Sequence, residues 1–165
     1  MIRVLNPQDA DMYQKLRLEA LRTNPEAFGS TYEREVAFTT EEICQRIKPE
    51  EGKFTLGAFM EERLSGIVTF VRESGPKTRH KSNVYGMYVS AAYRGMGIGR
   101  QLLEELIKEA GKLDGVEQIT LAVVRDNERA KALYTALGFT VFGVEKHALK
   151  INEMYYDEEW MVYFV

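Results

Sequence analysis

The chain has 165 residues, with 22 Lys and Arg against 25 Asp and Glu, and a formal net charge of -3. This length favours a single domain over residues 1–165 with a sizeable core, and the interspersed charges give no general attraction to nucleic acid or to an anionic membrane. No apolar run has the length of a signal peptide or a membrane span, so we expect a cytoplasmic protein. With one cysteine and two histidines we expect no internal disulfide and no metal site, and small-molecule chemistry is the favoured class.

The first elements are a short strand over residues 2–5 and a helix from Asn6 to about Arg22. Asn6 reads as the N-cap, and Pro7 stands at the first helical position. The expected inner face of this helix is a stripe of apolar residues: Met12, Leu16 and Ala20.

A second short helix is predicted after the capping-box pair Thr39 and Glu42. It carries Ile43, Cys44 and Ile47. We interpret Cys44 as a core residue rather than a nucleophile, because a free cysteine becomes reactive only in a polar, activating setting.

Three runs rich in strand-forming residues follow, over 54–60, 64–72 and 83–90. The first two are joined by a link short enough for a hairpin, and residues 73–82 read as an exposed loop. An antiparallel meander is therefore expected.

The remaining elements are a helix, a buried strand, a second helix and two closing strands. The first helix has an apolar face at helical spacing: Ile98, Leu102, Leu103, Leu106, Ile107 and Ala110. Residues 118–124 read as a strand buried on both faces, Asp126 or Asn127 caps the next helix, and Gly138 ends it. Strands over 139–144 and 160–165 complete an α+β arrangement with a parallel crossover.

The stretch "YRGMGIGR" (93–100) places three glycines on alternate positions at the start of a helix. Free backbone N–H groups and the helix dipole make such a turn an anion site, and missing β-carbons let phosphate oxygens approach. A tight turn alone would need fewer glycines. The spacing matches neither a P-loop nor a dinucleotide fingerprint, which excludes a nicotinamide oxidoreductase.

Arg94-Gly-Met-Gly97-Ile-Gly99 resembles the R/Q-x-x-G-x-G/A acyl-CoA loop of the GNAT superfamily of N-acetyltransferases. The preceding "VYGMYVS" resembles that family's central strand, and "VRDNERAKALYTALGF" resembles its second signature. The resemblance implies a mixed, mostly antiparallel sheet of about seven strands, flanked by about four helices. It also implies a splayed parallel strand pair at the coenzyme A site.

The resemblance further implies acetyl-CoA as co-substrate. Its pantetheine arm would lie beside Met87, Tyr88 and Val89, and its pyrophosphate would lie on Arg94, Gly95, Met96, Gly97, Ile98, Gly99 and Arg100. Asn127 and Ala130 would meet the pantetheine, although Asn127 also reads as a plain helix cap. Tyr134 would give a proton or hydrogen bond to the departing thiolate, the alternative being simple core packing.

The base and the acceptor pocket are less defined by the sequence. The stretch 82–85, where some relatives carry a Glu, has no carboxylate, so no general base is assigned. Glu33 and Glu35 are candidates, each otherwise an ordinary solvated charge, and a water chain that ends on backbone carbonyls is the alternative. The segments 28–38 and 146–157 should shape the pocket, with Tyr32, Glu33, Glu35 and Tyr155 as candidate residues. Their acids and aromatic rings would suit a cationic amine.

The predicted activity is transfer of an acetyl group to a primary amine by direct attack in a ternary complex, since no activated cysteine or serine is present. A small-molecule amine or amino acid is favoured over protein lysine as acceptor. The alternative is a non-catalytic acyl-CoA-binding regulatory module, against which Tyr134 and Asn127 argue. The last strand, "WMVYFV", could join two subunits of a homodimer or complete the monomer's own sheet.

Overall fold

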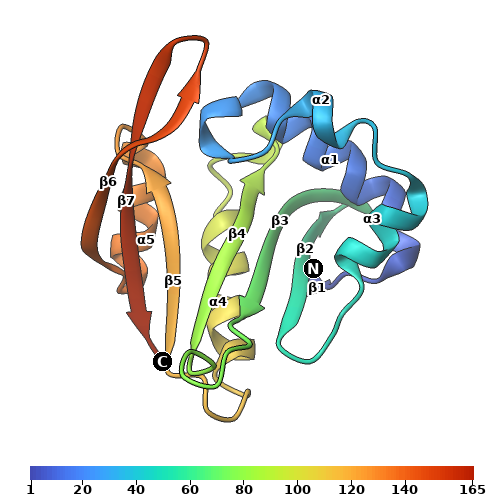
Figure 1. Cartoon of the computed structure of the whole chain (residues 1–165). Helices are drawn as coiled ribbons and strands as arrows, with labels where there is room; N and C mark the ends of the chain where they lie inside the picture. Colours follow the sequence, from blue (N-terminus) through green and yellow to red (C-terminus); the bar gives the residue numbers. More distant parts are fainter.

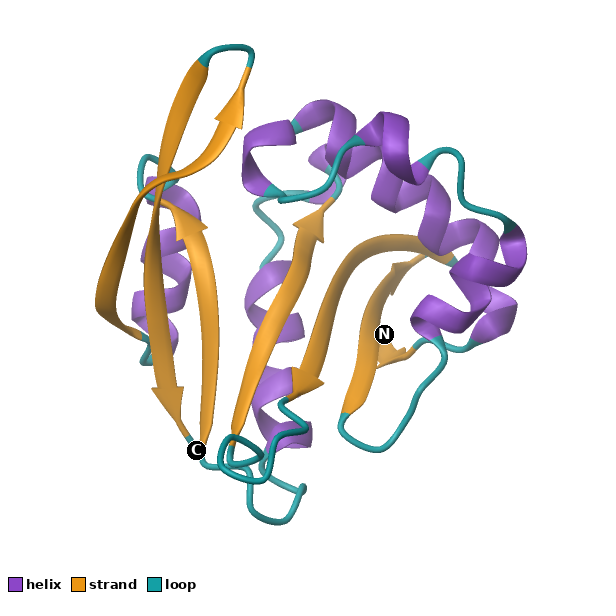
Figure 2. Ribbon diagram, viewed as in Figure 1, coloured by secondary structure: helices purple, strands orange, loops and turns teal.

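A computed structural model describes all residues 1–165 as a seven-stranded sheet with helices on both faces (Figures 1 and 2). The strands are β1 Ile2–Val4, β2 Lys53–Met60, β3 Arg63–Arg72, β4 Lys81–Val89, β5 Gln118–Val124, β6 Thr140–Ile151 and β7 Met154–Phe164. The α-helices are α1 Ala10–Thr23, α2 Tyr32–Glu35, α3 Thr40–Ile47, α4 Ile98–Ala110 and α5 Glu128–Leu137.

The strand order is β1-β2-β3-β4-β5-β7-β6, and every neighbouring pair is antiparallel except β4 with β5. This confirms the predicted α+β class, the mixed sheet and the parallel crossover. None of the helices combines the length and the apolar character that crossing a bilayer requires.

Two hydrophobic cores lie on opposite faces of the sheet. One joins α1 and α3 to sheet residues such as Phe59 and Ile67, and the other joins α4 to residues such as Val68 and Phe70. In Figure 1, α1 and α3 lie in front of the sheet and α4 lies behind it. The predicted apolar face of α4 is confirmed, with Leu102, Leu103 and Leu106 fully buried.

The inner face of α1 differs from the prediction at one position. Met12 is 37% exposed, whereas Tyr13 and Arg17 are buried together with Leu16 and Ala20. The buried stripe runs through residues spaced three and four apart from Tyr13, which leaves Met12 on its border. Cys44 is half-buried and packs against the same core, in line with the interpretation as a packing residue.

The last two strands are longer than predicted and form one hairpin, which extends beyond the sheet in Figure 1. The turn is Asn152-Glu153, and both residues have positive φ, 48° and 66°. Two-residue turns of this kind match the twist of antiparallel strands. Segment 146–157 is therefore the outer half of a hairpin, and β7 lies between β5 and β6, where it completes the monomer's own sheet.

Candidate active site

The parallel pair β4 and β5 separates along its length. Its register runs only from Lys81 opposite Gln118 to Asn83 opposite Thr120, and no pairing continues beyond. A bulge bends β4 after this point, because Tyr85 and Tyr88 lie opposite Thr69 and Ile67, so β4 holds one residue more than β3. Figure 1 shows the two strands diverging toward their carboxyl ends.

A cavity of about 800 Å³ lies between the separated strands. Its walls come from the carboxyl ends of β4 and β5, the turn before α4, the start of α5 and the segment after α1. All of the predicted cofactor residues except Met96 line this cavity. They are Met87, Tyr88, Val89, Arg94, Gly95, Gly97, Ile98, Gly99, Arg100, Asn127 and Ala130. Met96 is 54% exposed.

Each glycine of the turn before α4 has its own structural reason. Gly95 and Gly97 have φ of +80° and +77°, a region that residues with a β-carbon rarely adopt. Gly99 is inside the helix, and a β-carbon there would come within 3.2 Å of Met87 and 3.3 Å of Leu133. Because a β-carbon on Gly95 would meet nothing within 4 Å, the backbone there is open to the approach of an anion.

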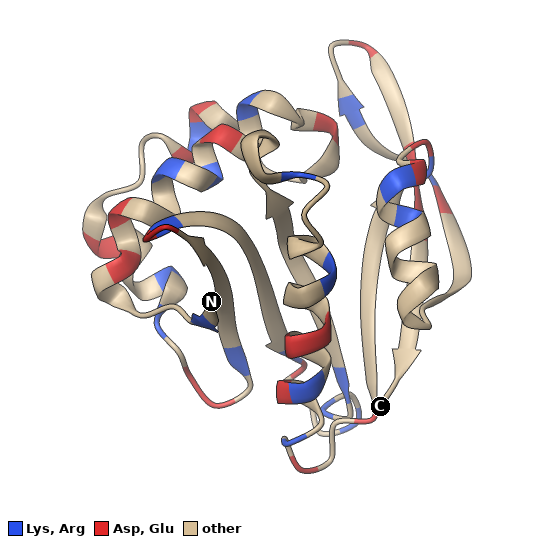
Figure 3. Ribbon diagram, turned by 180° about the vertical axis from the view of Figure 1, so that it is seen from behind, with Lys and Arg blue, Asp and Glu red and all other residues tan.

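Positive side chains surround this end of the cavity. Figure 3 shows Lys and Arg bands near the N-terminal ends of α4 and α5, and Arg94, Arg100 and Arg129 all line the cavity. Arg94 is held in place, since its Nε donates to the Val89 carbonyl at 3.0 Å and its Nη2 donates to Asn24 Oδ1 at 2.9 Å. The glycine turn and these cations together fit a group with several phosphates, such as coenzyme A.

Tyr134 packs in the core and also lines the cavity. Its ring is 7% exposed and meets Phe139 edge-on at a centroid distance of 5.9 Å, and the residue also lines the cavity. Burial raises the pKa of Tyr134 to about 12. The phenol is therefore neutral at physiological pH and keeps its proton.

Asn127 is the N-cap of α5, as predicted. Its Oδ1 accepts a hydrogen bond from the Ala130 backbone N–H at 3.2 Å. Since both residues also line the cavity, the cap fixes the end of α5 that faces the cavity.

Glu158 of β7 is the only carboxylate side chain that lines the cavity. It lies opposite Val124, at the end of β5, and opposite Glu145 of β6. Burial and the charge of Glu145 raise its pKa, as a proton acceptor working near neutral pH requires. The sequence analysis missed this residue, because the acidic run Asp157-Glu158-Glu159 carries no signal that separates it from an exposed surface.

None of the four residues predicted for the acceptor pocket lines the cavity. Tyr155 is 51% exposed near the tip of the hairpin and stacks on His147. Tyr32 packs near Arg22 and Glu33 is exposed. Other residues line the cavity instead, among them Arg17, Phe28, Ser30, Arg46, Glu158 and Trp160.

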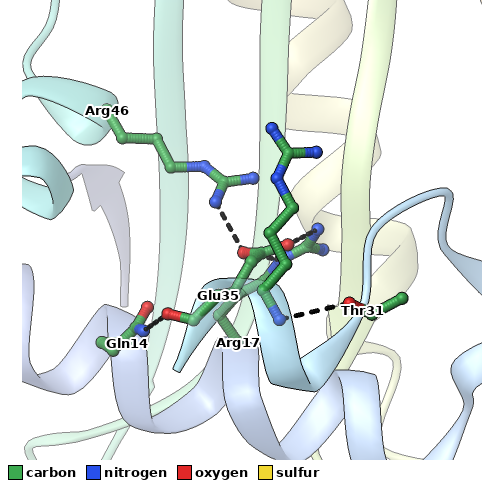
Figure 4. A network of polar contacts seen from close by, with 6 residues as sticks. Gln14, Arg17, Thr31, Glu35 and Arg46 are labelled. Carbon is green, nitrogen blue, oxygen red and sulfur yellow. Dashed lines mark hydrogen bonds and ion pairs between the residues drawn. The ribbon is translucent and has the colours of Figure 1, made fainter. Parts of the chain in front are cut away.

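Glu35 is fully buried rather than solvated. Arg17 donates two hydrogen bonds to its carboxylate, at 3.0 and 2.9 Å, and Arg46 donates one at 2.6 Å (Figure 4). Burial would raise the pKa of Glu35, but the hydrogen bonds from Arg17 and the charges of both arginines lower it below its ordinary value. An anion held in this way is a poor proton acceptor.

Comparisons with known proteins agree with this geometry. The family model of the acetyltransferase (GNAT) domain matches residues 2–160. The structure is similar to an acetyltransferase of the GNAT family from Streptococcus pneumoniae, with a TM-score of 0.88 and 24% identity over 100% of this chain and 99% of that one. It is also similar to a GNAT superfamily phosphinothricin acetyltransferase from Sinorhizobium meliloti, solved in complex with AcCoA, with a TM-score of 0.86 and 21% identity over 100% and 88% of the two chains.

In sequence, the chain is 39% identical to the N-alpha-acetyltransferase RimI of Mycobacterium tuberculosis over 69 residues, which are 42% of this chain and 41% of that protein. The matches span 22% to 41% of the lengths of the first curated relatives. The chain belongs to the GNAT family of acetyltransferases, which use acetyl-CoA.

Proposed function

We propose that this protein transfers the acetyl group of acetyl-CoA to a primary amine by direct attack in a ternary complex. The observation that carries the proposal is one cavity that brings together an open glycine turn, a neutral buried tyrosine and a carboxylate with a raised pKa. These are the groups that thioester aminolysis needs: an anchor for the donor, a partner for the departing sulfur and an acceptor for the proton of the amine.

The donor end is assigned to the turn before α4. The N–H groups of residues 94–100 and the side chains of Arg100 and Arg129 hold the pyrophosphate and the neighbouring phosphate. Backbone groups of Met87 and Val89 bond the pantetheine arm between β4 and β5. The N–H of Val89 lies beside the thioester carbonyl and stabilises the negative charge that develops on its oxygen.

Glu158 carries the proton transfer, and Tyr134 supplies a hydrogen bond to the leaving group. Glu158, directly or through one water, takes a proton from the ammonium form of the acceptor, because only an uncharged amine attacks. The hydroxyl of Tyr134 donates a hydrogen bond to the sulfur as the thiolate leaves. No cysteine or serine nucleophile lines the reacting end of the strands apart from Ser30, which has no adjacent histidine, so no covalent acyl-enzyme forms.

A small amine or an amino acid is the proposed acceptor, in preference to a protein lysine. The test uses purified protein with acetyl-CoA and a panel of small amines, amino acids, polyamines and lysine peptides, and it measures the release of the coenzyme A thiol. Release with at least one small amine supports the proposal. Tight calorimetric binding of acetyl-CoA without release for any amine would instead identify a regulatory binding module.

A further inference from the structure

Arg17 presents a charged donor that the protein leaves unpaired. The residue is 5% exposed, and its Nε and Nη2 donate to Glu35. Its Nη1 is buried and has no hydrogen-bond partner. Buried guanidinium groups are normally paired at every nitrogen that water cannot reach, so this nitrogen calls for an acceptor.

The unpaired nitrogen belongs to a residue of the active-site cavity. Arg17 lines that cavity, and a β-carbon built on Gly86, in the bulge of β4, would lie 3.6 Å from Nη1. The Arg17 guanidinium also lies over the Phe28 ring, 4.9 Å from its centroid, and Phe28 lines the cavity too. Gly86, in the bulge, therefore places no side chain in the space beside Nη1.

Arg46 brings a second guanidinium to the same place. Its Nη1 and the Nε of Arg17 donate to the same oxygen, Oε1 of Glu35, at 2.6 and 3.0 Å, so the two cations flank one carboxylate (Figure 4). The Arg46 side chain is 36% exposed and lines the cavity. Two guanidinium groups against one carboxylate leave one positive charge in excess at this end of the cavity.

We infer that the acceptor amine carries a carboxylate, as a free amino acid does, and that Arg17 and Arg46 bind it. This inference rests on the proposed function. The carboxylate contacts the exposed guanidinium of Arg46. It also accepts a hydrogen bond from Nη1 of Arg17, where it replaces the contact of the guanidinium with the Phe28 ring. Paired arginines suit a carboxylate because their planar N–H groups match its two oxygens.

The same charges disfavour a polyamine or another polycation. Glu35 is already neutralised by its two arginines, and Glu158 is the only carboxylate side chain left to face the cavity. A cationic tail beyond the reacting amine would meet Arg17 and Arg46.

The test compares matched acceptors. Each L-amino acid is assayed beside its amide and its decarboxylated amine, with acetyl-CoA as donor, and kcat/KM is measured from thiol release. The inference predicts at least a ~10-fold preference for the acid over its amide, the usual scale for losing a charged hydrogen-bond partner. Equal rates, or reaction confined to amides, polyamines or peptide N-termini, would overturn it.

Variants locate the effect. Arg17→Lys keeps a positive charge beside Glu35 but removes Nη1, and it should raise KM for the acid by about 10-fold while KM for the amide stays unchanged. Arg46→Gln, at a half-exposed position, tests the same subsite if Arg17→Lys does not fold. Arg22→Gln is the control, since Arg22 stacks on Tyr32 outside the cavity. An equal change in KM for acid and amide in the folded variants would contradict the assignment.

Failure of the inference and failure of the proposed function look different. Acetyl transfer without any preference for the acid removes only the carboxylate subsite. The absence of thiol release with every amine, together with no calorimetric heat from acetyl-CoA, removes the proposed function and the inference with it.

Discussion

Replacing Tyr134 by phenylalanine tests the proposed role of its hydroxyl with little structural change. The ring is 7% exposed and packs against Phe139, and phenylalanine keeps that contact. The proposed function uses the hydroxyl in the reaction and not in the core, so Tyr134→Phe should fold normally and bind acetyl-CoA as well as the parent. Its kcat should fall.

The size of the fall follows from the pKa. Tyr134 has a pKa of about 12, whereas a thiol titrates near ~8.5, so full proton transfer to the thiolate is uphill by roughly 5 kcal/mol. The proposed role of Tyr134 is therefore a hydrogen bond to a charged sulfur, a bond of about 1.5–3 kcal/mol. That range corresponds to a fall in kcat of about 10- to 150-fold.

The assay is steady-state thiol release with a saturating amine, beside calorimetry with acetyl-CoA and a thermal melt. Tyr163→Phe is the matched control, because Tyr163 also packs on Phe139, at 5.5 Å, but does not line the cavity. A kcat for Tyr134→Phe within ~3-fold of the parent, or an equal loss in Tyr163→Phe, would refute the assigned role. The parent enzyme should also show no kinetic limb from this phenol below about pH 11.

Three further changes have defined outcomes. Glu158→Gln should lower kcat by about 100-fold or more and abolish the acidic limb of the pH profile, and retained activity would contradict its role. Because the pKa of Glu158 is raised, its ionised form opposes folding above the ordinary glutamate range, so the variant should also melt at a slightly higher temperature at pH 7. Gly97→Ala introduces a β-carbon at φ +77°, a strain of about 1–2 kcal/mol, and calorimetry should find acetyl-CoA binding weakened about 10-fold. The control Gly143→Ala, at an open position with ordinary φ, should bind acetyl-CoA normally. Glu35→Ala leaves the buried Arg17 and the half-exposed Arg46 without their shared carboxylate and should cost about 3–5 kcal/mol in urea unfolding. A loss below about 1 kcal/mol would show that water already screens the group.

Features set by neighbouring residues could be read from the sequence. Asn6 and Thr39 both form the predicted caps, with the reciprocal hydrogen bonds of a capping box. Gly138 ends α5 at φ 105°. The glycine turn before α4 was recognisable because its backbone requirements lie within seven consecutive residues.

Features that depend on distant parts of the chain were missed. Glu158 reaches the cavity only because β7 pairs with β5 across about 35 residues of sequence, and its segment "YYDEEW" reads as an acidic surface. Glu35 is buried by arginines from two different helices. A charged residue at the inward position 17 of α1, between Tyr13 and Ala20, was the available signal that a buried partner existed.

A crystal structure of the protein with acetyl-CoA tests the central claim most directly. We expect the pyrophosphate within hydrogen-bond distance of main-chain N–H groups between residues 94 and 100, the pantetheine arm between β4 and β5, and the sulfur beside the Tyr134 hydroxyl. A donor bound at any other surface, or a pyrophosphate held away from the glycine turn, would contradict the account.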